Sequence, residues 1–315
     1  YWQNFVTGAD LNNMAAYYES LAGNVKAHWE EARQLDLGLD ISLFKNRLTL
    51  TADYFNNMRS KILIAQTQSV PDFTGLSDIL PAVNLGKVQN KGFDFELIWS
   101  DNTRNFSYRI GLTGGYANNK VLFFDEAANI PDYQKNTGHP MNSGLYYDAI
   151  GIFHNQSEID NYPHMEGVRP GDIIFRDVNG DNTIDGLDKI RINKSLVPTW
   201  TGGLNISASY KGFDLFILFQ GQAGAVRYVQ QTGSLSNNKN YLKSFYDSRW
   251  TEANPDTDYP RTFNRNDEYW VNSDNQNTFW LHKTDFIRLK NIEIGYTFPE
   301  KITQKLACKT IRLTV

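Results

Sequence analysis

The stretch from Leu35 to Tyr54 reads LDLGLDISLFKNRLTLTADY and carries the clearest pattern in the chain. Apolar residues occupy every second position in it, first up to Leu43 and again from Leu48, with Lys45-Asn46 between the two runs. Alternation with a period of two indicates strands with one apolar and one polar face, and the short polar break predicts a β-hairpin. Each strand has about ten residues, which is long for a globular domain but suits a tilted strand that crosses a membrane.

The same alternation returns along the chain. It covers residues 93–99, 106–112, 200–210, 213–219 and 292–298, and Ile98 interrupts the first of these runs. Polar turns are expected at 101–105, 211–212 and 299–301. Together these runs predict an all-β fold of roughly ten antiparallel strands.

Alternation alone fits both a soluble β-sandwich and a membrane barrel. A barrel is favoured by the long strands and by the aromatic residues at their ends, which resemble the girdles of membrane barrels. It is also favoured by the contrast between tight turns and long loops, which run roughly over 57–82, 120–170 and 222–283. We therefore predict an antiparallel transmembrane β-barrel with long extracellular loops, and keep a soluble β-protein as the alternative.

Composition excludes several other classes. Mean hydropathy is −0.49 and no run of about 20 apolar residues occurs, which excludes a bundle of membrane helices. The net charge is −4 without a block of Lys or Arg, so nucleic acid is not an expected partner. Cys308 is the single cysteine, which rules out an internal disulfide, and the scattered histidines make a zinc site improbable. No catalytic motif stands out, so no enzyme is expected.

Residues 12–23, before the first alternating run, are predicted to form a short helix.

Six segments, taken in order, resemble the SusC/RagA-type TonB-linked outer-membrane proteins of Bacteroidetes. They are NVKAHWEEARQLDLGLDISLFKNRLTLTADYFN (24–56), NLGKVQNKGFDFELIW (84–99), RPGDIIFRDVNGDNTIDGLDK (169–189), PTWTGGLNISASYKGFDLFILFQGQAG (198–224), SRWTEANPDTDYPR (248–261) and DFIRLKNIEIGYTFPEKI (285–302). The resemblance implies a 22-stranded barrel filled by an N-terminal plug, coupled to the TonB complex and covered by a SusD-like lipoprotein. On this basis residues 1–315 are expected to be the C-terminal part of the barrel domain, about half a barrel, without the plug and the last strands.

The resemblance also implies a function. It predicts active import of glycans across the bacterial outer membrane, with the SusD-like lipoprotein and the TonB complex as partners and the outer-membrane lipid around the barrel. Two alternatives stay open. One is an importer of peptides with the same architecture, and the other is a soluble carbohydrate-active or lectin-like β-protein with a calcium-braced loop.

An acidic loop between Asp177 and Asp188 carries the sharpest local motif. Residues with side-chain or main-chain oxygen ligands fall at loop positions 1, 3, 5, 7, 9 and 12, which are Asp177, Asn179, Asp181, Thr183, Asp185 and Asp188. Such spacing wraps a short loop around one hard cation, so we predict a structural Ca²⁺ site. Position 6 is Asn182 instead of Gly, although Asn tolerates left-handed backbone geometry. The competing interpretation is a solvated turn.

Two further groups are candidates for contacts with cargo or partners. Aromatic residues crowd the loop over 241–280: Tyr241, Phe245, Tyr246, Trp250, Tyr259, Tyr269, Trp270, Phe279 and Trp280. Most of them are expected to build a small core of the loop itself, and the others could stack on sugars or meet the lipoprotein. The charged residues on the polar face of the strands are expected to line the lumen: Asp36, Asp40, Asp53, Asp94, Glu96 and Arg109.

Overall fold

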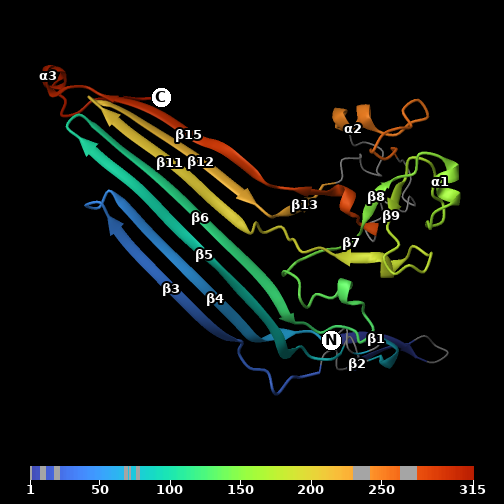
Figure 1. Ribbon diagram of the computed structural model, residues 1–315. Coiled ribbons are helices and arrows are strands. Elements are labelled where there is room, and N and C mark those ends of the chain that lie inside the picture. Colours follow the sequence, from blue (N-terminus) through green and yellow to red (C-terminus); the bar gives the residue numbers. More distant parts are fainter. Residues whose placement is uncertain are drawn as a thin grey trace.

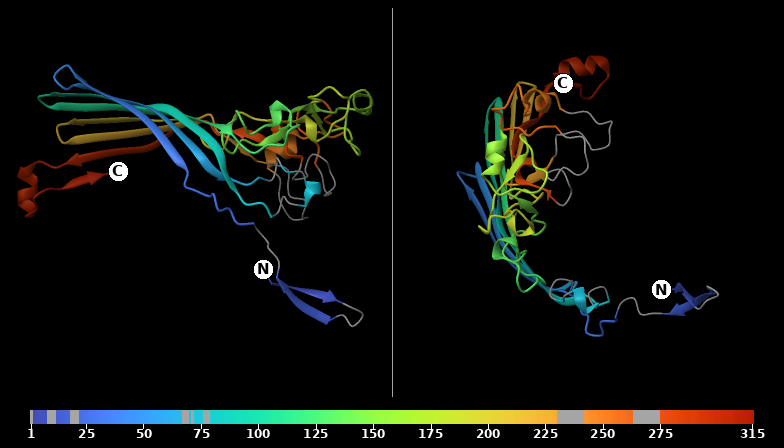
Figure 2. Two further views of the ribbon diagram at one scale, coloured as in Figure 1. Left: turned by 90° about the horizontal axis from the view of Figure 1, so that it is seen from below. Right: turned by 90° about the vertical axis from the view of Figure 1, so that its right-hand side faces the viewer.

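The computed structural model describes residues 2–7, 12–17, 22–66, 70, 72–75, 79–229, 242–262 and 275–315. Its main element is one antiparallel sheet of eight strands in the order β16-β15-β12-β11-β6-β5-β4-β3 (Figure 1). The strands are β3 (Glu31–Leu43), β4 (Leu48–Ile64), β5 (Val83–Thr103), β6 (Phe106–Phe123), β11 (Trp200–Tyr210), β12 (Phe213–Ala223), β15 (Phe286–Thr297) and β16 (Arg312–Thr314). Figure 2 shows that this sheet is curved. Within the described residues the sheet has eight strands where roughly ten were expected.

The register gives the sheet one apolar and one polar face. In one row across it, Ile41 lies opposite Leu50, followed by Leu97, Leu112, Leu204, Phe219 and Leu289. Leu39 and Leu112 are 52% and 41% exposed in spite of their apolar side chains. A face of this size and polarity is covered by lipid in a membrane barrel, whose lumen side is polar.

Aromatic rows bound the apolar face at both ends. Tyr54, Phe93, Tyr116 and Trp200 form one row, and Phe106, Tyr210, Phe213 and Tyr296 form the other. Along β11 the rows are ten residues apart, from Trp200 to Tyr210, or about 33 Å of strand. A tilt of about 45° reduces this to about 23 Å across the membrane, close to the roughly 25 Å apolar band of outer-membrane barrels.

Tight turns close the hairpins at one end of the sheet, here called the tight-turn end. Lys211 and Gly212 both have positive φ, 47° and 92°, as a two-residue turn between twisted strands requires. The turn after β3 has four residues instead of two, from Phe44 to Arg47. The turn expected at 299–301 is a short helical segment, α3 (Glu300–Thr303) with η6 (Gln304–Leu306), which leads into β16.

At the opposite, long-loop end the strands run further than predicted. β4 continues to Ile64 and β6 to Phe123, although loops were expected from 57 and from 120, whereas β5 begins at Val83, where the loop expected over 57–82 ends. These extensions lie beyond the aromatic row that contains Tyr54 and Tyr116, outside the band of alternating apolar residues. The apolar alternation therefore ends there while the backbone pairing continues.

A layer of short elements, here called the loop layer, lies at the long-loop end (Figure 1). It contains β7 (Leu145–Tyr147) paired with β10 (Lys189–Arg191), β8 (Ala149–Ile152) with β9 (Ile173–Phe175), and β13 (Val226–Tyr228) with β14 (Leu281–Lys283). Its helical segments are η1 (Asp72–Thr74), η2 (Asp132–Gln134), α1 (Gln156–Asp160), η3 (Gly186–Asp188), α2 (Lys243–Ser248) and η5 (Thr278–Trp280). Its buried core is formed by Tyr147, Ile152, Ile173, Phe175, Ile184, Phe245 and Trp280.

The helix predicted over 12–23 is wrong. β2 (Asn12–Tyr17) is a strand that pairs with β1 (Trp2–Thr7), away from the main sheet (Figure 2). Helix propensity is a weak prior that strand pairing overrides. No helix among the described residues is long and apolar enough to cross a membrane.

Candidate functional site

The polar face of the sheet carries the first candidate site, and most of the predicted charged residues gather on β3, β4 and β5. Asp53 stands directly opposite Asp94 across the β4–β5 pair. Glu96 shares a row with Thr51 and Asp40, and the Thr51 hydroxyl donates a 2.7 Å hydrogen bond to Asp40 Oδ1. With Asp36 these carboxylates form an acidic stripe, which makes no ion pair within the described part of the chain.

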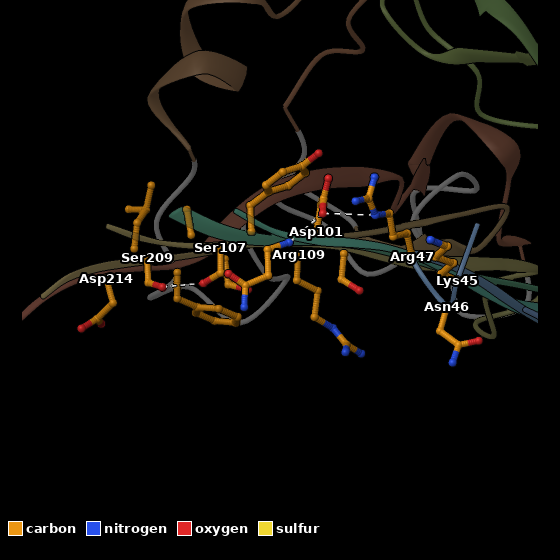
Figure 3. A pocket seen from close by; sticks show the side chains of 15 residues that line it. Lys45, Asn46, Arg47, Asp101, Ser107, Arg109, Ser209 and Asp214 are labelled. Carbon is orange, nitrogen blue, oxygen red and sulfur yellow. Dashed lines mark hydrogen bonds and ion pairs between the residues drawn. The ribbon is translucent and has the colours of Figure 1, made fainter. Parts of the chain in front are cut away.

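Arg109 lies apart from this stripe, nearer the tight-turn end. It pairs with Ser100 on β5 and Ser207 on β11. It lines a cavity of about 730 Å³ together with hydroxyl-bearing residues, and Ser107 Oγ lies 2.6 Å from Ser209 Oγ there. Figure 3 shows Arg109 and Asp214 on one side of the sheet and the Arg47–Asp101 ion pair on the other.

A second cavity on the polar face, of about 550 Å³, lies between the acidic stripe and the later strands. Asp94 and Glu96 line one wall, and Lys290 of β15 lines another. Gly115 and Gly203 line the same cavity and have no side chain to fill it. Carboxylates, hydroxyls and an ammonium around one hollow can bind a polar solute or a polar protein surface by hydrogen bonds.

The acidic loop is held by bonds from its carboxylates to its own backbone. Asp177 accepts from the N–H groups of Gly180 and Asn182, at 2.7 and 2.9 Å. The fully buried Asp188 accepts from Val178 and Asp185 at 2.7 and 2.8 Å. These bonds connect both ends of the loop to its own backbone.

The remaining residues of the predicted calcium site lie near the exposed tip of the loop. Asp181 accepts from Thr183 N at 2.8 Å, and Asn179 Oδ1 accepts from Asp181 N at 3.1 Å. Asn182 has a φ of 65°, the left-handed geometry expected at position 6. No group of three or more His, Cys, Asp or Glu in the described ranges is arranged to hold a metal ion, so calcium ligation stays a prediction.

The loop layer anchors the acidic loop from outside. Gln134 Nε2 of η2 donates to the carbonyls of Gly186 and Lys189, at 2.8 and 2.9 Å, and Tyr133 donates to Leu187 O at 2.7 Å. Tyr147 stacks on Phe175 below the loop, with ring centroids 4.7 Å apart. Burial, reinforced by the negative charges of Asp185 and Asp188, raises the pKa of Tyr147 to about 12.

The aromatic residues predicted over 241–280 divide into two groups. Phe245 and Trp280 are fully buried, and Trp250 and Phe279 pack against the same core, which confirms the expected loop core. Tyr246 and Tyr259 are exposed, and the Arg249 guanidinium lies 3.7 Å from the centroid of the Tyr246 ring. The predicted residues Tyr241, Tyr269 and Trp270 lie outside the described residues.

A buried ion pair that joins two parts of this layer was not predictable from the sequence. Arg261 Nε lies 2.6 Å from Oδ1 of Asp172, which is fully buried. A carboxylate next to Ile173 and a guanidinium far along the chain share no spacing that would reveal the pair. Only the fold brings them together.

A curved antiparallel sheet with a lipid-type face, a polar face and a folded loop layer at one end is the wall of a transmembrane β-barrel receptor. The family model described as "TonB dependent receptor-like, beta-barrel" matches residues 1–315. The chain belongs to this family, and the fold prediction is confirmed. Members are transporters, not enzymes, in the outer membrane of Gram-negative bacteria.

Individual relatives are similar at moderate identity. TonB-dependent receptor P3 of Formosa agariphila is 28% identical over 310 residues, covering 93% of this chain and 29% of that protein. TonB-dependent receptor SusC of Bacteroides thetaiotaomicron is 25% identical over 294 residues, covering 88% and 27%. The chain thus spans less than a third of the length of these two relatives.

Solved structures share the fold. The match to a structure of the RagAB peptide transporter covers 100% of this chain and 35% of the matched chain, with a TM-score of 0.68 and 22% identity. A structure of the RagAB peptide importer in the open-open state gives a TM-score of 0.69. At this identity the likeness describes the fold alone.

Proposed function

We propose that this chain is the C-terminal part of the barrel domain of an importer that takes up oligosaccharides through the outer membrane by TonB-driven transport. The observation that carries the proposal is the two-faced sheet, whose apolar rows suit lipid and whose polar face suits a wet lumen. Family membership argues against the alternative of a soluble carbohydrate-active or lectin-like protein.

Oligosaccharide cargo is supported by the chemistry of the polar face and by the likeness to SusC. Carboxylates, amides and hydroxyls around the 550 Å³ cavity offer many acceptors and donors for sugar hydroxyls. Peptide cargo is the second candidate, because the RagAB structures of the same fold are described as a peptide transporter. The acidic stripe would then favour basic peptides.

A SusD-like lipoprotein is the proposed partner at the long-loop end. The folded loop layer presents the exposed Tyr246 and Tyr259 there, with the partly exposed Arg249 against the Tyr246 ring, and Tyr and Arg are enriched at interfaces. The TonB complex would act from the periplasm through a region of the receptor outside this chain.

We also propose one structural Ca²⁺ in the acidic loop. The spacing of the oxygen donors and the left-handed Asn182 support it, while the backbone bonds of Asp177 and Asp188 show that the loop also has an internal scaffold. A cation would add to that scaffold and brace an extracellular loop.

Uptake in the native bacterium tests the cargo. A strain without the receptor gene, with and without a plasmid copy, is given labelled oligosaccharides or labelled peptides, and accumulation is measured before and after the proton gradient is collapsed. We expect gradient-dependent uptake of oligosaccharides that the plasmid restores. Restored uptake of peptides alone would replace the glycan proposal, and uptake that is indifferent to the gradient would contradict TonB coupling.

A further inference from the structure

We propose that the rim of tight turns binds anionic phospholipid headgroups of the membrane leaflet that it meets. This inference rests on the proposed placement of the sheet in an outer membrane. Every turn at this end carries cations: Lys45, Arg104, Lys211, Lys301, Lys305 and Lys309. The whole chain has a net charge of −4, so this concentration of positive charge at one end is not a consequence of composition.

The register places these turns side by side along the tight-turn end of the sheet. Ser100 N donates to Arg47 O at 2.7 Å, which joins the first turn to the end of β5, and Thr297 N donates to Gly212 O at 2.8 Å. In Figure 1 the turns after β3 and β5 lie at the same end of the sheet as α3. The cations therefore form one belt instead of isolated points.

The belt is available for a partner. All six cations are exposed, and they form no ion pair within the described part of the chain. Nearby acids are already used: Asp101 pairs with Arg47 at 3.2 Å, and Asp214 pairs with Arg312 at 2.5 Å. Glu300 alone offsets the charge within the turns themselves.

Aromatic side chains fix the depth of the belt. Lys211 Nζ lies 5.1 Å from the ring centroid of Tyr210, which belongs to the aromatic row of this end. The ring centroid of Phe44, beside Lys45, lies 6.0 Å from that of Trp99. Tyr and Trp settle at headgroup level, so cations next to them meet lipid phosphates, with their alkyl stems against the apolar zone.

Two cations of the long-loop end, both on β4, are paired with acids. There Arg59 pairs with Glu30 at 3.0 Å, and Lys61 pairs with Glu31. Arg59 and Lys61 are thus compensated by acids at or just before the start of β3, whereas none of the six belt cations is compensated within the described part of the chain. A belt of uncompensated cations suits a leaflet with anionic phospholipids, which attract basic segments next to a membrane.

The test measures which lipids surround the full-length receptor in vesicles of phosphatidylcholine with one fifth phosphatidylglycerol. Spin-labelled phosphatidylglycerol or phosphatidylcholine reports the fraction of each lipid at the protein boundary. The belt variant carries Lys45→Gln, Arg104→Gln, Lys211→Gln and Lys305→Gln. A matched variant removes four exposed cations from the other end: Lys26→Gln, Arg33→Gln, Lys91→Gln and Lys120→Gln.

We expect the receptor and the matched variant to prefer phosphatidylglycerol over phosphatidylcholine about twofold or more, and this preference to fall in high salt. In the belt variant the ratio of the two preferences should fall to about one. A belt variant that keeps the preference, a matched variant that loses it equally, or a receptor without preference would each overturn the proposal. Vesicle incorporation and heat-dependent gel migration are measured first. If the unaltered receptor does not enter vesicles, the proposed function in the outer membrane is contradicted, and not the lipid preference of the belt. This first measurement therefore distinguishes failure of the proposed function from failure of the lipid proposal.

Discussion

Arg261 Nε lies 2.6 Å from Asp172 Oδ1, and this contact joins two segments of the loop layer that are 89 residues apart. The backbone repeats the link, since Arg261 N donates to Gly171 O at 2.8 Å. Asp172 also accepts from Arg169 N at 2.9 Å. The loop layer is thus a folded unit that contains a buried charge pair.

Replacing one member of this pair should unfold the loop layer locally. Asp172→Asn or Arg261→Met leaves an uncompensated buried group, with an expected cost of about 3–5 kcal/mol. Hydrogen exchange over 145–175 and 242–262 measures the loss, while gel migration of the barrel should not change. Arg176→Gln, at the exposed pair with Asp148, is the control and should cost less than about 1 kcal/mol. Equal protection from hydrogen exchange in Asp172→Asn and in the control Arg176→Gln would contradict the role of Asp172.

Adjacent positions on β6 should respond oppositely to the same charge. Leu112→Arg puts a guanidinium on the lipid face near the middle of the strand, at an expected cost of about 2–4 kcal/mol. Thr113→Arg faces the lumen opposite Glu96 and should be tolerated. Urea unfolding in vesicles compares the two variants. Similar stability for both would show that the two faces have been wrongly assigned.

The loop layer should weaken in alkali because of Tyr147. Its pKa, about 12, exceeds the value of about 10 in an unfolded chain, so the folded state holds its proton more tightly. The stabilisation is complete below pH 10 and is lost as the pH rises through 10 to 12. Absorbance at 295 nm should show a late titration that Tyr147→Phe reduces. Tyr228, also raised to about 12 by burial, should account for the late signal that remains.

Calcium should protect the acidic loop if the proposed site exists. Cleavage between 177 and 188 by an added protease should slow several-fold with Ca²⁺, and Asp177→Asn with Asp181→Asn should abolish the effect. Asp160→Asn, an acid of α1 outside the loop, serves as the control. Protection that is identical with a chelator would show that the bonds from Asp177 and Asp188 suffice.

The sequence predicts the sheet well because the membrane part of each strand obeys a period-two rule. The hairpins that join Leu43 to Leu48 and Tyr210 to Phe213 follow directly from it. Beyond the aromatic row the apolar alternation stops although the backbone pairing continues, so the pattern predicts ends of β4 and β6 that come too early. Three consecutive left-handed residues from Phe44 to Asn46 lengthen the first turn in a way that composition does not reveal.

The candidate site was predictable only in part. The acidic residues from Asp36 to Glu96 could be assigned to the polar face by parity, because register preserves alternation. Their gathering on three neighbouring strands depends on the pairing of Asp53 with Asp94, which spans a long connection. Burial of Asp172 and Asp188 was not predictable, because acidic residues in loops are ordinarily exposed.

Single cysteines along β11 of the full-length receptor, in a Cys308→Ser background in native outer membranes, test the central claim most directly. Spin labels at successive positions from 201 to 208 are exposed to oxygen, which concentrates in lipid, and to a water-soluble nickel complex. We expect strict alternation, with Leu204 and Ile206 accessible to oxygen and Asn205 and Ser207 accessible to the nickel complex. Equal access of the nickel complex to both sets would contradict a sheet with one face toward lipid and the other toward the lumen.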